Sequence, residues 1–132
     1  MQQLSRLQAD AEYHVSNPNK AKGTAWETKI MEDLREHGYH AHRLALRGGL
    51  DEGDIAIPSH PDGELGGQHV IIQAKDVGRL QLSLFCDELI VQMQNAQTSF
   101  AAIVAKRRRK GVEEAYVILL WKEFRDASHP LT

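Results

Sequence analysis

Cysteine, aromatic residues and long apolar runs are all scarce in this sequence of 132 residues. A single cysteine, Cys86, cannot form an internal disulfide, so we expect a chain that folds in a reducing compartment. No apolar run approaches the ~20 residues that a membrane-spanning helix requires, and the first residues lack the pattern of a secretory signal peptide. We therefore expect a cytoplasmic protein with no membrane association.

A large net charge is also missing. The 16 Lys and Arg residues nearly balance the 18 Asp and Glu residues, so the formal net charge of −2 does not by itself indicate a nucleic-acid partner. The cations are nevertheless unevenly distributed, because Lys106–Lys110 is an uninterrupted basic run. Such a run is either a solvated strand end or a surface that contacts phosphates.

Length and composition predict one globular domain. An apolar content of 42% and a charged content of 26% are typical of such domains, and a chain of this size can bury a core without disulfides. In residues 1–20 a weak helical pattern is interrupted by Ser16–Asn19, so we expect an N-terminal arm there. Residues 21–132 are expected to form the single domain.

Two short runs rich in Ile and Val organise the middle of the chain. They cover Asp54–Ile57 and Val70–Lys75, with the turn-rich segment Pro58–Gln68 between them. Because side chains alternate along a strand, Gln73 and Lys75 share a face. If the two strands pair antiparallel, the Asp54 carboxylate lies near the Gln73 amide and the Lys75 ammonium.

The remaining pattern predicts an α/β sandwich with a mixed central sheet flanked by helices. Helices are expected over residues 22–37, 80–97 and 121–127, and further strands over 39–46, 100–105 and 116–120. The expected inner faces consist of Trp26, Ile30, Met31 and Leu34 in the first helix, and Leu82, Phe85, Leu89, Met93 and Ala96 in the second.

Glu27 has two explanations. Thr24 is expected to cap the first helix, and Glu27 then completes a capping box, with Gly38 as the helix terminator. Alternatively, Glu27 lies at the edge of the buried stripe and has a functional role. Trp121 likewise has two explanations, as a core residue or as a dimer contact.

These side chains provide the groups that metal-dependent hydrolysis of a phosphodiester needs. Asp54 would bind Mg²⁺ directly, and Gln73 would contribute its amide oxygen. The backbone carbonyl of Ala74 would add a further ligand, and Glu27 would bind through water or at a second metal. Lys75 would orient the attacking water or stabilise the charge on the phosphoryl group.

The order Glu, then Gly-Asp, then (Glu/Gln)-x-Lys resembles the PD-(D/E)XK nuclease superfamily. Its archaeal-type Holliday junction resolvases are the most similar, over about residues 20–125, at Lys22-Gly23-x-x-x-Glu27, Arg47-Gly48-Gly49 and Gly53-Asp54-Ile55. The resemblance implies a restriction-endonuclease-like fold, Mg²⁺-dependent cleavage of four-way or other branched DNA, with Mn²⁺ as a substitute, and a homodimer. It implies catalytic or metal-binding roles for Glu27, Asp54, Gln73 and Lys75.

The chain departs from the resolvase pattern in two places. Gln73 stands where that family usually has Glu, as it does in Mrr-type restriction nucleases, and the segment from Asp54 to Gln73 is longer than usual. A neutral ligand removes one negative charge, so we expect weak metal binding and leave the number of metal ions open. Two other functions also stay open: a Mrr-like nuclease that cuts duplex DNA, and a catalytically inactive DNA-binding module, although Lys75 has no evident use in the latter.

Several further residues are candidates for a lesser role. The expected contacts with nucleic acid are Lys22, Arg47, Arg79, Lys106, Arg107, Arg108, Arg109 and Lys110, each of which has an ordinary surface cation as its alternative. The clustered histidines, His37, His40 and His42, lack the cysteine pair or spaced acid of a zinc site and are expected on the surface or in a strand. Cys86 is expected to be a buried helical residue.

Overall fold

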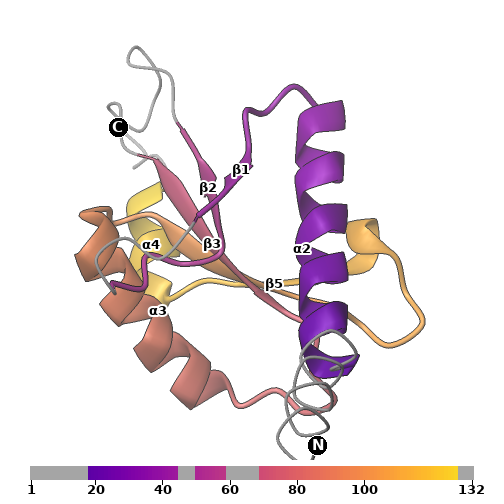
Figure 1. Cartoon of the computed structure of the whole chain (residues 1–132). Coiled ribbons are helices and arrows are strands. Elements are labelled where there is room, and N and C mark those ends of the chain that lie inside the picture. Colours follow the sequence, from indigo (N-terminus) through magenta and orange to yellow (C-terminus); the bar gives the residue numbers. More distant parts are fainter. Residues whose placement is uncertain (1–17, 45–49, 59–68, 128–132) are drawn as a thin grey trace, which may run out of the picture.

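A five-stranded mixed sheet forms the centre of the protein in a computed structural model, which describes residues 18–44, 50–58 and 69–127 (Figure 1). The elements are α2 (Pro18–Glu36), β1 (His42–Arg43), β2 (Ile55–Ile57), β3 (Val70–Lys75), α3 (Leu82–Ala96), β4 (Ala101–Ala105), a 3₁₀ turn (Val112–Glu114), β5 (Tyr116–Ile118) and α4 (Trp121–Ala127). The strands lie in the order β1-β2-β3-β4-β5, and β3 and β4 alone among these neighbours are parallel. The predicted α/β sandwich with a mixed sheet is therefore confirmed.

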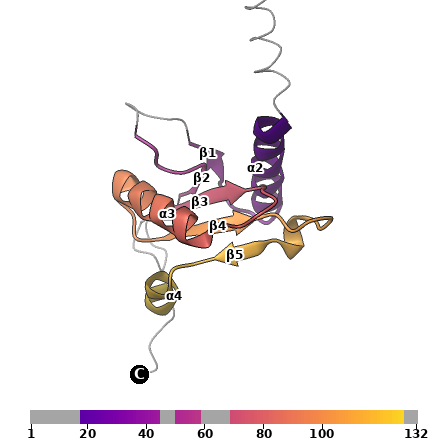
Figure 2. The ribbon, with the colours of Figure 1, turned by 90° about the horizontal axis from the view of Figure 1, so that it is seen from below.

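Helices α2 and α3 cover opposite faces of the sheet (Figures 1 and 2). On one face, Trp26 and Ile30 of α2 pack with Ile72 of β3. On the other face, Leu89 of α3 packs with Ile71. Because successive residues of β3 point to opposite faces, this central strand must be apolar on both sides, which is why its sequence reads as a continuous run of Val and Ile.

Helix α2 begins earlier than the capping pattern predicted. It starts at Pro18, which suits the first turn of a helix because proline has no amide hydrogen to leave unpaired. Thr24 lies inside the helix, where its carbonyl accepts a hydrogen bond from the Thr28 hydroxyl at 3.0 Å. The predicted N-cap at Thr24 and its capping box with Glu27 are therefore wrong.

The end of α2 agrees with the prediction. Gly38 adopts the left-handed conformation with φ of 89°, and the following amide of Tyr39 donates to the Leu34 carbonyl at 2.9 Å. The strand expected over residues 39–46 is shorter, because pairing with β2 is confined to His42 and Arg43. Residues 1–17, the loop of Arg47 and most of the connection between β2 and β3 lie outside the described residues.

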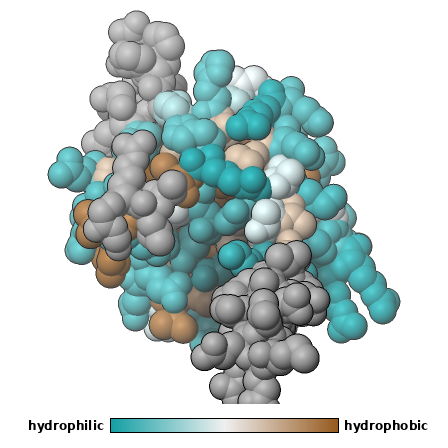
Figure 3. All heavy atoms as spheres, in the orientation of Figure 1, coloured by the Kyte–Doolittle hydropathy of each residue, from teal (hydrophilic) through white to brown (hydrophobic). Residues whose placement is uncertain are grey.

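Trp121 is not a core residue. Its side chain is 70% exposed at the start of α4, next to the edge strand β5. Tyr116 and Val117 of β5 are exposed as well. Further exposed apolar side chains gather over α3 in Figure 3. None of the helices in the described ranges is long and apolar enough to span a membrane.

Gly53 allows the chain to pass very close to β3 immediately before β2. Its φ is 107°, and a Cβ atom added there would lie 2.3 Å from Cγ2 of Ile71. Only glycine tolerates both the left-handed backbone and this close approach. The next residue along the chain is Asp54, whose position is therefore set by contact between the backbone and the sheet.

Candidate active site

Asp54 is bound to β3 through both its backbone and its side chain. Its amide donates to the Ile72 carbonyl at 3.0 Å, and its carboxylate Oδ2 accepts the Ala74 amide at 2.8 Å. In a continuous antiparallel pair a backbone carbonyl of β2 would accept that amide. The carboxylate takes over this role where β2 starts, which fixes Asp54 at the open end of the β2–β3 pair.

Glu27 reaches Asp54 from α2. The charge of Asp54 raises the pKa of Glu27, so the two carboxyl groups lie close together, and the Arg43 guanidinium lies 3.5 Å from the Glu27 carboxylate. Arg43 also donates to the Thr24 carbonyl at 3.1 Å and to the Thr28 hydroxyl, so it joins β1 to α2 beside the acids. The structure therefore brings together two carboxylates that come from different elements.

The pKa of each acid lies above its ordinary value, and burial is the main cause for both. Burial raises the pKa of Glu27 above its ordinary value, and the neighbouring Asp54 charge raises it further, while Arg43 lowers it. Burial also raises the pKa of Asp54, which the hydrogen bond from Ala74 and the charge of Lys75 partly offset. A closely spaced, partly desolvated pair of acids is a site that a cation or a shared proton stabilises.

Gln73 and Lys75 lie on the α3 face of the sheet, as the alternation along β3 predicted. Gln73 is 2% exposed, and its Nε2 donates to the Glu88 carboxylate of α3 at 2.9 Å. Lys75 donates to the same Glu88 oxygen at 3.3 Å, and its Nζ lies 4.3 Å from the centre of the Phe85 ring. Both side chains are thus held by one residue of α3.

Ala74 connects the two groups of side chains. The odd-numbered residues Ile71 and Lys75 direct backbone groups toward β4, because the Ile71 amide donates to the Phe100 carbonyl and the Lys75 carbonyl accepts the Lys106 amide. The backbone groups of Ala74 therefore point the other way, toward Asp54. Its carbonyl faces the same open end of the β2–β3 pair as the Asp54 carboxylate.

The oxygen donors at this end suit a hard divalent cation such as Mg²⁺. In the described part of the chain, no group of three His, Cys, Asp or Glu side chains is placed to hold a metal, so the two acids would need other oxygen ligands. Gln73 Oε1 is buried and has no hydrogen-bond partner, and the Ala74 carbonyl faces Asp54. These residues fit the predicted donor set of Asp54, Gln73, Ala74 and Glu27.

Two residues of the site were not among the sequence candidates. Glu88 lies one helical turn after Phe85 and directly before Leu89, at the edge of the buried stripe of α3. The same criterion singled out Glu27 and would have found Glu88. Arg43 gave no comparable signal, because its partner Glu27 lies on another element.

The basic run begins directly beside this site. The Lys106 amide donates to the Lys75 carbonyl at 2.8 Å, so the run continues from the strand next to β3. Four of its cations, Lys106 to Arg109, line a cavity of about 600 Å³ together with Lys22 and Asp76. Lys110 lines a neighbouring cleft instead, and Arg79 is exposed without lining either one.

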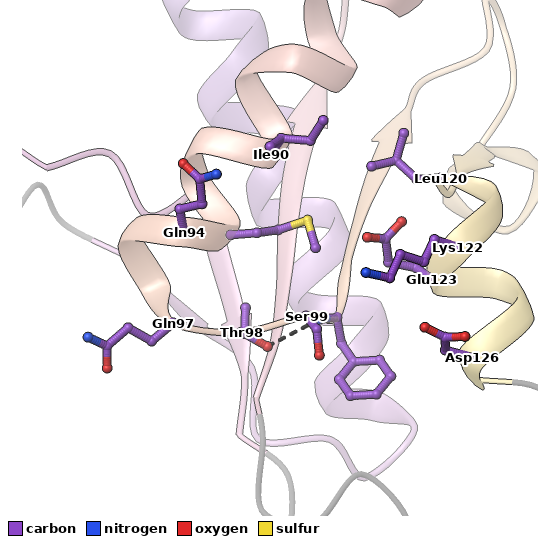
Figure 4. A pocket seen from close by; sticks show the side chains of 11 residues that line it. Ile90, Gln94, Gln97, Thr98, Ser99, Leu120, Lys122, Glu123 and Asp126 are labelled. Carbon is purple, nitrogen blue, oxygen red and sulfur yellow. Dashed lines mark hydrogen bonds between the residues drawn. The ribbon is translucent and has the colours of Figure 1, made fainter.

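A second cavity lies away from these residues. It has a volume of about 580 Å³ between the end of α3 and α4, with Ile90, Met93 and Leu120 among its lining residues (Figure 4). Lys122, Glu123 and Asp126 of α4 line the opposite side. None of the proposed catalytic side chains lines this cavity.

No protein-family model and no curated protein matches the chain. A solved structure that does match is that of Archaeoglobus fulgidus Hjc, a Holliday junction resolvase from an archaeal hyperthermophile. The two sequences are 22% identical, the match covers 70% of this chain and 74% of that one, and the TM-score is 0.46. A similarity of this size does not establish an activity, so the function proposed below rests on the side chains of the site.

Asp54→Asn should increase the free energy of unfolding at neutral pH in the absence of divalent cations. Because burial raises the pKa of Asp54 in the folded state, wild-type stability falls as the pH rises from the ordinary carboxyl pKa through that raised value. Asparagine has no such cost, and its oxygen still accepts the Ala74 amide. Urea unfolding of both proteins between about pH 3 and 8 measures the difference, with Asp87→Asn on the exposed face of α3 as a control for loss of one charge. A difference that is the same at every pH would contradict this account.

Proposed function

We propose that the protein is a Mg²⁺-dependent endonuclease that hydrolyses phosphodiester bonds in four-way or other branched DNA, as Holliday junction resolvases do. The observation that supports it best is the Asp54 carboxylate, fixed by the Ala74 amide between a second acid and the charge of Lys75. Lys22 and four cations of the basic run line a cavity, and one of them, Lys106, is hydrogen-bonded through its amide to the Lys75 carbonyl. The proposed endonuclease activity and the preference for branched DNA rest on the sequence motifs and the side chains of the site.

Each side chain has a defined task in this proposal. Asp54, Gln73 Oε1 and the Ala74 carbonyl would hold Mg²⁺ or Mn²⁺, which would supply polarisation of the phosphate and activation of a water. Glu27, kept in place by Arg43, would orient the attacking water or hold a second ion. Lys75 carries its charge toward the phosphate and stabilises the negative charge that develops there.

Two other functions are distinguished by particular residues. A Mrr-like nuclease acting on duplex DNA is favoured by Gln73 itself, because that position carries Gln in such enzymes. A catalytically inactive DNA-binding module is favoured by the missing negative charge. Lys75 argues against the inactive module. Glu88 and Phe85 hold it near Asp54, and a protein that only binds DNA would not need a cation there because the basic run already supplies cations.

Asp54→Asn should abolish cleavage and leave DNA binding nearly unchanged, because binding depends on the cations and hydrolysis on the metal. The assay incubates labelled four-way junction, linear duplex and single strand with Mg²⁺, with Mn²⁺ or with EDTA. We expect cleavage of the junction in either metal and none in EDTA. Cleavage of duplex alone would favour the Mrr-like function, and binding without cleavage in any metal would favour the inactive module. A folded Asp54→Asn protein with full activity would refute the proposed site.

Arg107→Ala combined with Arg108→Ala should weaken binding to every DNA and reduce its dependence on salt. Each lost phosphate contact lowers the slope of log affinity against log salt by about one unit. The matched control is Lys122→Ala with Arg125→Ala, which removes two cations from α4. Fluorescence anisotropy over a range of salt concentrations gives both slopes. Equal slopes for the two double variants would place the basic run away from DNA.

A homodimer follows from the need to cut two symmetry-related strands, since one proposed site cuts one strand. The exposed apolar side chains at one edge of the molecule, Tyr116 and Val117 of β5 and Trp121 and Phe124 of α4, support an interface there. The rings of Trp121 and Phe124 lie with centroids 5.8 Å apart. Isologous contact between two copies would cover both.

Sedimentation velocity at micromolar concentration should therefore show a dimer. Trp121→Ser with Phe124→Ser should shift it to monomer, because the change removes apolar area from the proposed interface. Tyr39→Ser, which removes an aromatic ring of similar exposure beyond the end of α2, should leave it dimeric. A wild-type monomer that only nicks a cruciform plasmid would rule out paired cleavage by a dimer.

A further inference from the structure

Glu88 of α3 accepts a hydrogen bond from the amide nitrogen of Gln73. The amide group of glutamine carries a donor nitrogen and an acceptor oxygen of nearly equal size, so a half-turn about its last bond exchanges them. An ionised carboxylate accepts hydrogen bonds and donates none, and Glu88 Oε2 lies 2.9 Å from Nε2. Gln73 Nε2 therefore points toward Glu88 of α3, and Gln73 Oε1 points away from that carboxylate.

The oxygen left over is the unusual atom. Gln73 is 2% exposed, and its Oε1 is buried without a hydrogen-bond partner. A buried polar atom without a partner is unfavourable, but turning the amide around would place this oxygen against the Glu88 carboxylate instead. Gln73 Oε1 is therefore available to bind a cation or to accept a hydrogen bond from a group that enters the site.

The same glutamate oxygen also fixes Lys75. Its Nζ lies 3.3 Å from Glu88 Oε2 and 4.3 Å from the centre of the Phe85 ring, and only 21% of the lysine side chain is exposed. Lys75 is thus held on two sides near Asp54, whose pKa its charge lowers. One residue of α3 therefore positions both members of the Gln-x-Lys pair.

We infer that Glu88 is the positioning residue that lets a neutral glutamine serve in the metal site. It turns Gln73 Oε1 toward the ion and places a negative charge behind the amide, which polarises the amide so that its oxygen is a better ligand. The inference rests on the proposed metal-dependent nuclease and adds to it how the missing carboxylate is compensated. A glutamate at position 73 would instead bring two carboxylates together in a buried place, so the presence of Glu88 also explains why this position carries glutamine.

The test compares metal binding, cleavage and stability in four proteins. Isothermal titration of Mn²⁺ and Mg²⁺ into DNA-free protein gives the metal affinity, and urea unfolding gives stability. Glu88→Ala should weaken metal binding by about 10- to 100-fold, the usual effect of losing an outer partner of a ligand. Glu88→Gln keeps an acceptor oxygen for Gln73 Nε2 and should retain most of the affinity while lowering kcat, because Lys75 loses its ion pair. Asp87→Ala, an exposed acid on the same helix, controls for loss of one charge and should match the wild type.

The exchange of the two side chains provides the sharpest comparison. Gln73→Glu alone should lower stability at neutral pH, because two carboxylates then meet. Gln73→Glu together with Glu88→Gln restores one hydrogen bond between one acid and one amide, and should recover stability and bind metal at least tenfold more tightly than the wild type. Recovery of stability without this gain in affinity would overturn the inference, since position 73 would then not face the ion.

The remaining outcomes separate this inference from the proposed function. If the wild type binds metal and cuts DNA but Glu88→Ala does so equally well, Glu88 has only a structural role and the inference alone fails. If Glu88→Gln loses as much affinity as Glu88→Ala, the Glu88 carboxylate is itself the ligand, and the positioning role is wrong. If the wild type neither binds a divalent cation nor cuts DNA, both fail together.

Discussion

The hydrogen bond from the Ala74 amide to the Asp54 carboxylate is the contact on which the rest of the site depends. It replaces one rung of the β2–β3 ladder by a side chain, so the acid is fixed with the precision of the sheet itself. Gly53, the residue before Asp54, makes this hydrogen bond possible. Its backbone passes so close to Ile71 that no larger residue would fit there. The position of the acid is thus a property of the main chain on both strands, and the other side chains of the site are arranged around it.

The acids outnumber the cations around Asp54. Glu27, Asp54 and Glu88 lie near two cations, Arg43 and Lys75. The charge of Asp51 also acts on Asp54, where it raises the carboxyl pKa. The neutral Gln73 adds no further negative charge, which distinguishes this donor set from sites where three carboxylates converge on the metal.

Much of this architecture follows from the sequence, and the exceptions have physical causes. Alternation along Val70–Lys75 placed Gln73 and Lys75 on one face correctly, because a strand leaves only two choices. The helical period also identified the buried stripes of α2 and α3, apart from the exposed Leu82 at the first residue of α3. Capping failed at Thr24, since a proline can begin a helix where a local pattern suggests a break. The core explanation of Trp121 failed because the exposure of a residue at the start of α4 depends on what lies beside it in space. Arg43 escaped notice because its contacts are made with residues 15 and 19 positions away.

The two tryptophans of the chain lie in opposite environments, which makes them separable optical probes. Trp26 is 1% exposed, its indole nitrogen donates to the Val104 carbonyl, and it directly precedes Glu27. We expect it to emit at short wavelength and to be little accessible to iodide. In a single copy of the chain Trp121 is 70% exposed, so there it should emit at longer wavelength. A quencher such as iodide, which reaches Trp121 but not Trp26, therefore separates two signals. The quenched part reports on the surface of α4, and the remaining part reports on the core beside Glu27.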